Sequence, residues 1–313
     1  MGRGAGALLE VASRAESRAP VSPALLLSLR ASGWCKSAEY QAPRHVDDVV
    51  RCDCGEDAFF VSDLSGESIT LGVADGVGGS RSEFCDPGLF AWRLMQSCED
   101  VSVRPPPPWE LPVEAPRDAL EAKRVLHDGF WRQVSDVRGS TVGASTASIV
   151  TVDRVSGLLT VANLGDSGVM VIRGASVVLM TEAQQHDWNS PFQLAVTQDG
   201  SPGGDVPKFA DQYYTYLEEG DLVLLMTDGV LDNLSHLDIL DSVRYLPRDD
   251  PSAIAADLVS FASRRAKGKT DTPFSKRARQ LGMDVAPRGK EDDATVVAVV
   301  VGRPHSFGVE QPG

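Results

Sequence analysis

Seven short apolar runs, rich in β-branched residues and bounded by Gly, Asp or Ser, constrain the fold of this chain most strongly. None is longer than nine residues, and they cover 57–64, 68–75, 145–153, 158–166, 168–174, 221–228 and 293–301. Runs of this length and composition between turn residues are typical of buried β-strands. Because only short turns separate several of them, we expect neighbouring strands to be antiparallel.

Three further stretches show helical periodicity, at 86–100, 116–137 and 251–266. The first and third begin with Pro near the first helical position, where the missing N–H of proline is tolerated. Antiparallel strands flanked by helices indicate an α+β fold and not a doubly wound parallel sheet. Because the sequence has no internal repeat and no linker that divides it, we predict a single domain over 46–303 and a C-terminal tail at 304–313.

The N-terminal segment differs from this body in composition. Residues 1–45 are rich in Ala, Ser and Arg and carry six basic side chains against three acidic ones. This composition is typical of an organelle transit peptide, and a plain disordered tail is the alternative. The five cysteines, an odd number without a secretory signal, favour a reducing compartment over a disulfide framework.

The charge of the body excludes some classes of ligand. The whole chain has a formal charge of −14, and residues 46–313 carry 24 basic and 41 acidic side chains. An acidic body repels phosphate backbones, which argues against nucleic acid as the main ligand and suits a protein that binds cations. We expect no membrane span, because no apolar run approaches the ~20 residues needed.

Carboxylates recur where the predicted strands begin or end. Asp75 and Asp228 each end an apolar run and are followed by Gly-Val, which for either alone is interpreted most simply as a hairpin turn. At least five strand ends, however, place a carboxylate at a turn. The acidic residues concerned are Glu56, Asp57, Asp75, Asp166, Asp228 and Asp292.

Such a cluster points to a bound divalent cation. Acidic side chains gathered at the ends of buried strands repel one another unless a cation neutralises them. Gly76, beside Asp75, has no Cβ to keep its backbone carbonyl away from the same ion. Oxygen ligands without His or Cys favour Mg²⁺ or Mn²⁺ over Zn²⁺.

Six separated motifs now identify a family resemblance. They are "GEDAFF", "VADGVGG", "GSTVGAST", "VANLGDSGVMVIR", "MTDGVLDN" and "EDDATVVAVVV". In order and spacing they resemble the metal-dependent protein phosphatases of type 2C, over roughly residues 47–302. Two further segments, "QQHDWNSPFQL" (184–194) and 273–296, are similar to the branch that includes a mitochondrial matrix phosphatase.

The resemblance implies a fold, a cofactor and a set of roles. The fold would be a four-layer α-β-β-α sandwich, with two Mg²⁺ or Mn²⁺ ions at one edge and a weaker third in some members. A hydroxide that bridges the two ions would hydrolyse phosphoserine or phosphothreonine. Asp75 would bridge both ions with the Gly76 carbonyl, Glu56 supported by Asp57 would hold one, Asp228 and Asp292 would hold the other, and Asp166 the third. The implied catalytic residues are Asp75, Asp228 and Asp292.

Two positions depart from the family pattern. Many members carry an arginine that grips the phosphate four residues before the ligand Glu, whereas Arg51 lies five residues before Glu56. Arg51 is therefore a candidate phosphate-binding residue. Many members also have a His after the Asp-Gly pair as a general acid, and this chain has Val77. His186, in the branch-like segment, is as consistent with a loop role as with catalysis.

These features predict a protein-serine/threonine phosphatase whose partners are phosphorylated proteins. We expect a monomer in the mitochondrial matrix, with plastid or cytoplasm as the alternatives. The alternative function is a catalytically weak pseudophosphatase that acts as a regulatory binding module. It predicts lost ligand carboxylates, yet all of them are present. A small-molecule phosphohydrolase stays open as well, because specificity would lie in the surrounding loops at 77–86 and 185–220.

Overall fold

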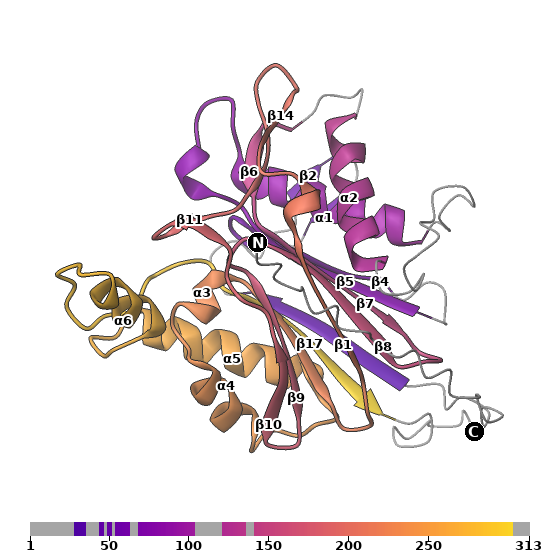
Figure 1. Cartoon of the computed structure of the whole chain (residues 1–313), viewed down its shortest axis with the longest axis vertical. Helices are drawn as coiled ribbons and strands as arrows, with labels where there is room; N and C mark the ends of the chain where they lie inside the picture. The colour runs from indigo at the N-terminus through magenta and orange to yellow at the C-terminus, as the bar shows by residue number, and fades with distance from the viewer. Residues whose placement is uncertain are drawn as a thin grey trace, which may run out of the picture.

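Two five-stranded antiparallel sheets form the centre of the computed structural model (Figure 1). The structure describes residues 28–35, 44–46, 49–51, 54–62, 68–103, 121–135 and 141–302. The first sheet has the order β1-β17-β16-β9-β10 and the second the order β15-β8-β7-β5-β4. The first comprises β1 (Ser28–Cys35), β9 (Gly168–Arg173), β10 (Ser176–Met180), β16 (Leu222–Met226) and β17 (Thr295–Gly302). The second comprises β4 (Asp57–Ser62), β5 (Ser68–Asp75), β7 (Ala147–Asp153), β8 (Leu158–Leu164) and β15 (Asp211–Tyr216).

Helices cover the outer face of each sheet (Figure 1). On the second sheet lie α1 (Pro87–Ser102) and α2 (Glu121–Val134), and on the first lie α3 (Asp228–Leu231), α4 (His236–Val243) and α5 (Pro251–Ala266). The smaller elements are β2 (Arg44–Val46), β3 (Val49–Arg51), β6 (Gly143–Ser145), β11 (Gln185–Asp187), β12 (Ser190–Pro191), β13 (Leu194–Val196), β14 (Pro202–Gly204) and α6 (Pro273–Gln280). The predicted four-layer α-β-β-α sandwich is confirmed.

The central strands are apolar throughout because both of their faces are buried. In β17, Val297, Val299 and Val301 pack between the two sheets, whereas the alternate residues Val296 and Val300 face the helices of the first sheet. Successive side chains of a strand point to opposite faces, so a strand between two layers needs apolar residues on both. This explains why the apolar runs of the sequence are nearly unbroken.

Two of the predicted helices begin at their expected positions. Asp86 caps α1 by accepting a hydrogen bond from the Leu89 amide at 3.1 Å, and Asp250 caps α5 by accepting one from the Ala253 amide at 2.9 Å. In both helices Pro follows the cap. A capping carboxylate satisfies an amide that has no partner within its own helix, and this fixes where the helix starts.

The N-terminal boundary of the domain differs from the prediction. Ser28–Cys35, placed by the sequence within a tail of residues 1–45, forms β1 and pairs along its whole length with β17. The reason is tertiary: without β1, β17 would be the edge strand of its sheet, and its unpaired backbone groups would offer a ladder to an extended segment. Arg44 and His45, also placed within that tail, belong to β2, and residues 1–27, 36–43 and 303–313 lie outside the described residues.

Other features also escaped prediction. The edge strands β10 and β15 alternate exposed and half-buried residues, without the apolar run that marks a central strand. Cys54 is disulfide-bonded, which the preference for a reducing compartment did not predict, whereas Cys85 and Cys98 are buried free thiols. None of the described helices is long and apolar enough to span a membrane.

Candidate metal centre

Strand pairing within the second sheet brings the first two acidic positions together. Asp57 opens β4, Asp75 closes β5, and the antiparallel register sets these two residues directly opposite each other. Asp57 is buried with 1% of its surface exposed. The backbone of Asp75 is held in turn by Thr146, whose hydroxyl accepts a hydrogen bond from the Asp75 amide at 3.2 Å.

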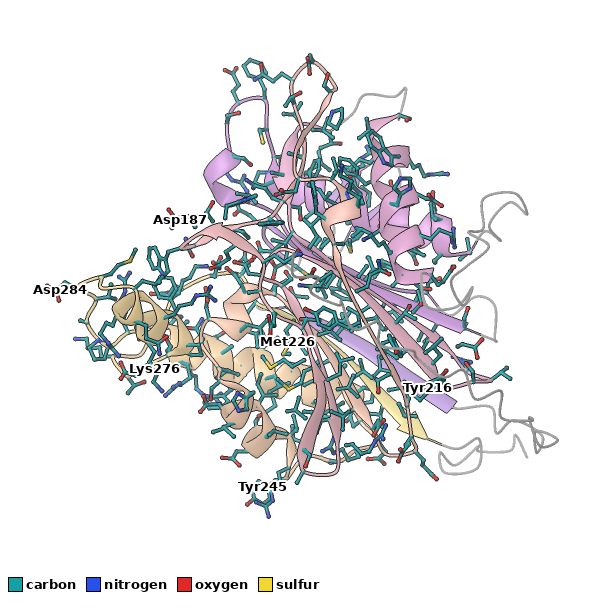
Figure 2. The ribbon with its side chains drawn as sticks, viewed as in Figure 1. Asp187, Tyr216, Met226, Tyr245, Lys276 and Asp284 are labelled. Carbon is teal, nitrogen blue, oxygen red and sulfur yellow. The ribbon has the colours of Figure 1, made fainter. Side chains whose placement is uncertain are left out.

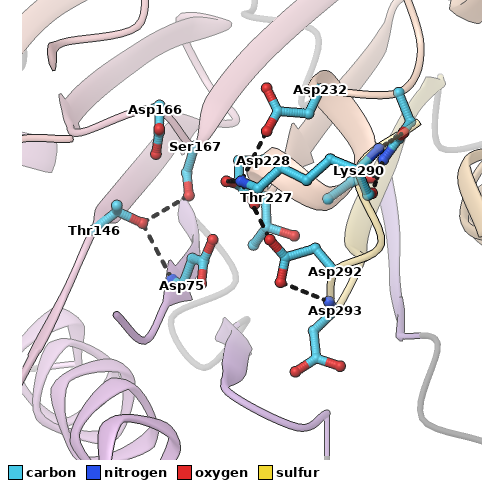
Figure 3. Close-up of polar contacts among 12 residues, drawn as sticks. Asp75, Thr146, Asp166, Ser167, Thr227, Asp228, Asp232, Lys290, Asp292 and Asp293 are labelled. Atoms are coloured by element: carbon cyan, nitrogen blue, oxygen red, sulfur yellow. Dashed lines mark hydrogen bonds and ion pairs between the residues drawn. The ribbon is translucent and has the colours of Figure 1, made fainter. Parts of the chain in front are cut away.

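The first sheet supplies the facing carboxylates. Asp228 follows β16 as the first residue of α3, and Asp292 lies shortly before β17, the antiparallel neighbour of β16. Thr227 ties the two sheets together, because its hydroxyl donates to Asp57 Oδ2 at 2.9 Å. Figure 3 shows the Asp75 and Asp292 carboxylates pointing toward one another, with Asp166 entering from the turn between β8 and β9.

Glu56 lies beside this cluster with its carboxylate engaged elsewhere. Its amide donates to Asp293 Oδ2 at 2.8 Å. Its Oε1 accepts hydrogen bonds from Nε and Nη2 of Arg81 at 3.0 and 2.8 Å. Arg81 is not among the site residues predicted from the sequence. The side chain of Arg51 lies outside the described side chains.

Two glycines allow the close packing of the loops that carry these carboxylates. A Cβ on Gly76 would lie 2.4 Å from the Pro87 carbonyl oxygen, and one on Gly229 would lie 1.7 Å from the Asp293 carbonyl oxygen. Neither contact is tolerable for a larger residue. The glycine that follows each of the two key Asp residues is therefore required by packing.

Lys290 neutralises part of the cluster. Its ammonium lies 2.5 Å from Asp228 Oδ2, 2.9 Å from Asp232 Oδ2 and 3.2 Å from Asp292 Oδ2 (Figure 3). Burial alone would lower the pKa of Lys290, but the attraction of Asp228 and Asp232 outweighs burial and raises it. Lys290 therefore stays charged within the centre.

The positive charge near the other carboxylates is too small to neutralise them. Burial, followed by repulsion from neighbouring Asp residues, raises the pKa of Asp75 well above its ordinary value. Burial also raises the pKa of Asp57, in spite of hydrogen bonds from threonine side chains. Burial and the charge of Asp228 raise the pKa of Asp166 to about 6 and that of Asp232 to about 7. Ionisation of these buried carboxylates therefore costs free energy, and a bound cation would remove this cost.

The donor atoms fit a hard divalent cation. Asp57 Oδ1 and Asp228 Oδ1 are buried without a hydrogen-bond partner in the described part of the chain. Oxygen atoms of this kind are the ligands that Mg²⁺ and Mn²⁺ prefer. Among the described residues, no three Asp, Glu, His or Cys side chains already converge on one point that could hold an ion. Asp228 and Asp292 are turned toward Lys290, and Glu56 toward Arg81.

A cavity of about 690 Å³ adjoins the centre. Asp166 and Asp232 line it, together with Trp188, Phe274, Arg277 and other residues. The rings of Trp188 and Phe274 lie 5.2 Å apart, which joins the β11–β12 hairpin to α6. Figure 2 shows Asp187 of this hairpin and Lys276 of α6 on the same side of the molecule.

Comparisons with known proteins identify the family. The family model of stage II sporulation protein E (SpoIIE) matches residues 121–301, more than half of the chain. The human protein phosphatase PTC7 homolog is 34% identical, with 79% of this chain and 79% of the relative covered. The chain belongs to the PP2C family. It is a metal-dependent serine/threonine protein phosphatase of the PTC7 type.

Other relatives agree with this assignment. The PTC7 homolog fig of Drosophila virilis is 35% identical over 78% of this PP2C chain and 77% of its own. The photosystem II phosphatase PBCP superposes with a TM-score of 0.68 at 25% identity, with 87% of this chain and 98% of PBCP covered. The phosphatase PstP, solved with two manganese ions, shares the fold at 16% identity and a TM-score of 0.53, over 88% of this chain and 99% of its own.

The structure brings most of the predicted site residues together and adds several that were missed. Asp57, Asp75, Asp166, Asp228 and Asp292 gather at one end of the sandwich. Asp232 had a usable signal, since it lies four residues after Asp228 and so one helical turn further on. Lys290 and Arg81 had none, because the contacts of Lys290 with Asp228 and Asp232, and of Arg81 with Glu56, join separate segments of the chain.

The metal-free protein should become less stable as pH rises. Asp166 and Asp232 have folded-state pKa values of about 6 and 7, above the ordinary value of 3.8. Between pH 3.8 and the folded-state pKa values, the folded state binds more protons than the unfolded state. The contribution of these two groups to stability is therefore greatest at acidic pH and is lost as pH rises through their folded-state pKa values. Thermal unfolding in a chelator should give a higher midpoint at about pH 5.5 than at about pH 7.5.

Asp232→Asn serves as the control, since it removes one of the titrating groups and should flatten this pH dependence. A metal-free chain that is equally or more stable at the higher pH would contradict the electrostatics described above.

Proposed function

We propose that the chain hydrolyses phosphoserine and phosphothreonine with two divalent cations, Mg²⁺ or Mn²⁺, held by the carboxylates at the open end of the sandwich. The observation that carries this proposal is the meeting of Asp57 and Asp75 from one sheet with Asp228 and Asp292 beside the other. The Oδ1 atoms of Asp57 and Asp228 are buried there without a hydrogen-bond partner among the described residues. When bound, the ions supply an activated water and neutralise the charge of the phosphoryl group.

Each residue has a proposed role in this centre. Asp75 would hold both ions, and the backbone carbonyl of Gly76 would assist it. Glu56, supported by Asp57, would hold one ion, and Asp228 and Asp292 would hold the other. Asp166 is proposed for a further, weaker ion, at a position where Lys290 competes. The catalytic set is Asp75, Asp228 and Asp292.

Arg51 is proposed to bind the phosphate of the substrate, on the basis of its position in the sequence. Val77 has no proton to give, so in this proposal the leaving serine or threonine oxygen takes its proton from water. His186 instead holds the hairpin: its Nε2 lies 2.9 Å from Asp205 Oδ2, and its ring stacks on Phe192 at a centroid distance of 4.0 Å. This pairing supports a loop role for His186.

Substitution of the central carboxylates should abolish turnover. Asp75→Asn and Asp228→Asn are each expected to lower kcat on a phosphothreonine peptide with Mn²⁺ by at least about 100-fold, because each removes a charged ligand. Asp199→Asn is the matched control, since Asp199 is also followed by Gly but lies in an exposed turn. If the wild-type chain binds Mn²⁺ yet hydrolyses neither the peptide nor an aryl phosphate, the regulatory alternative replaces this proposal.

The cavity beside the centre is proposed to receive the peptide that carries the phosphorylated residue. Trp188→Ala removes one of its aromatic walls and should raise KM for a phosphothreonine peptide by roughly tenfold, in proportion to the lost apolar contact. An aryl phosphate is too small to reach this wall, so its kcat/KM should stay unchanged. An equal loss with both substrates would contradict a peptide-binding cavity and favour a small-molecule phosphohydrolase.

An organelle location, the mitochondrial matrix first and plastid or cytoplasm as alternatives, is proposed from the basic N-terminal composition. Because β1 begins at Ser28, a removable segment would end before it. Full-length protein with a C-terminal fluorescent tag should enter the matrix and lose its N-terminus there, as mass spectrometry of the purified product would reveal. Deletion of residues 2–27 should leave the tag in the cytoplasm. Cytoplasmic protein with an intact N-terminus would contradict import.

The proposed partners are phosphorylated proteins, and a monomer is proposed for the enzyme in solution.

A further inference from the structure

The ammonium of Lys290 lies among three carboxylates of the metal centre, one of which, Asp232, lines the cavity. Its ammonium contacts Asp228, Asp232 and Asp292, all within 3.2 Å. An ammonium has three N–H donors, so one is available for each of the three carboxylates. The side chain of Lys290 is mostly buried, with 19% of its surface exposed.

The carboxylates around Lys290 form a group that could take a metal ion in its place. Asp232 lies close enough to Asp228 and Asp166 for the charges of these two residues to raise its pKa. Asp228 is more than nine-tenths buried, and its Oδ1 has no hydrogen-bond partner among the described residues. Asp166 and Asp232 also line the 690 Å³ cavity, through which a hydrated ion can approach.

The backbone of Lys290 is fixed independently of its charge. Its amide donates to Asn233 Oδ1 at 3.0 Å, and its carbonyl accepts a hydrogen bond from Asn233 Nδ2 at 2.8 Å. Its ammonium also lies 5.8 Å from the centre of the Phe274 ring. Because the side-chain amide of Asn233 holds the backbone at position 290, we expect the loop to keep its conformation when an uncharged side chain of similar length replaces Lys290.

We infer that Lys290 is a built-in counter-cation that takes the place of a divalent ion at Asp166, Asp228 and Asp232. In the metal-free protein it holds Asp228, Asp232 and Asp292, and it limits the number of ions that the centre accepts. This inference rests on the proposed function, since it presupposes that the same centre binds divalent cations. It makes Lys290 a positioning residue, which acts through Asp228 and touches no substrate.

The test compares Mn²⁺ uptake by the full-length wild type with that of three variants. Lys290→Met removes the charge and keeps most of the length, Lys290→Arg keeps the charge, and Lys276→Met removes an exposed lysine of α6 as the matched control. After equilibrium dialysis, metal analysis gives the number of Mn²⁺ ions per chain. Thermal unfolding with and without Mn²⁺ gives a second readout that does not depend on activity.

Lys290→Met is expected to bind one Mn²⁺ more per chain than the wild type. Without metal its unfolding midpoint should fall by about 5 °C or more, because three carboxylates lose their counter-charge, and Mn²⁺ should restore it. The double variant Lys290→Met, Asp232→Asn should lose the additional ion. Lys290→Arg and Lys276→Met should take up the same number of ions as the wild type.

If Lys290→Met binds the same number of Mn²⁺ ions as a wild type that takes up Mn²⁺, and has the same unfolding midpoint without metal, this inference is overturned. The proposed function is then left intact. Fewer ions in Lys290→Met would also overturn it, because Lys290 would then assist metal binding instead of replacing an ion. A wild type that takes up no Mn²⁺ would overturn the proposed function itself, and the inference with it.

Discussion

The repulsion among buried carboxylates is the constraint on which the rest of this structure depends. Pairing of β4 with β5, and of β16 with β17, forces Asp57, Asp75, Asp228 and Asp292 to one end of the sandwich. Burial then raises the free energy of their charged forms. The protein stabilises this arrangement with Lys290, with hydrogen bonds such as that from Thr227 to Asp57, and with the divalent cations that PP2C enzymes require.

The sandwich provides the rigidity that such an arrangement needs. The apolar layer between the sheets and the two layers beneath the helices fix the strand ends, so the carboxylates cannot separate to relieve their repulsion. Gly76 and Gly229 let the connecting loops approach closely at the same point. Stability is thus concentrated in the layers, and electrostatic strain is concentrated at the edge where the carboxylates meet.

Two basic side chains, Arg81 and Lys290, bind different carboxylates of the centre. Arg81 holds Glu56 on one side, and Lys290 holds Asp228, Asp232 and Asp292 on the other. The Arg81 pair is more exposed to solvent, so its contribution to stability is small. Lys290 is enclosed, and its contacts are correspondingly stronger. In this arrangement metal binding competes with internal ion pairs, which links the charge state of the centre to the stability of the fold.

The sequence by itself determined the layers and most of the acidic site. β-branched runs that end on Asp specify buried strands whose ends carry charge, and the Asp-Pro starts of α1 and α5 are written locally. Only the tertiary structure decided that Ser28–Cys35 completes the first sheet, and that Lys290, Asp232 and Arg81 join the centre. The pairing of β1 with β17, and the contacts of Lys290 with Asp228 and of Arg81 with Glu56, join separate segments of the chain, which neither composition nor periodicity encodes. For Asp232 the spacing from Asp228 is a signal, but its contact with Lys290 comes from the tertiary structure.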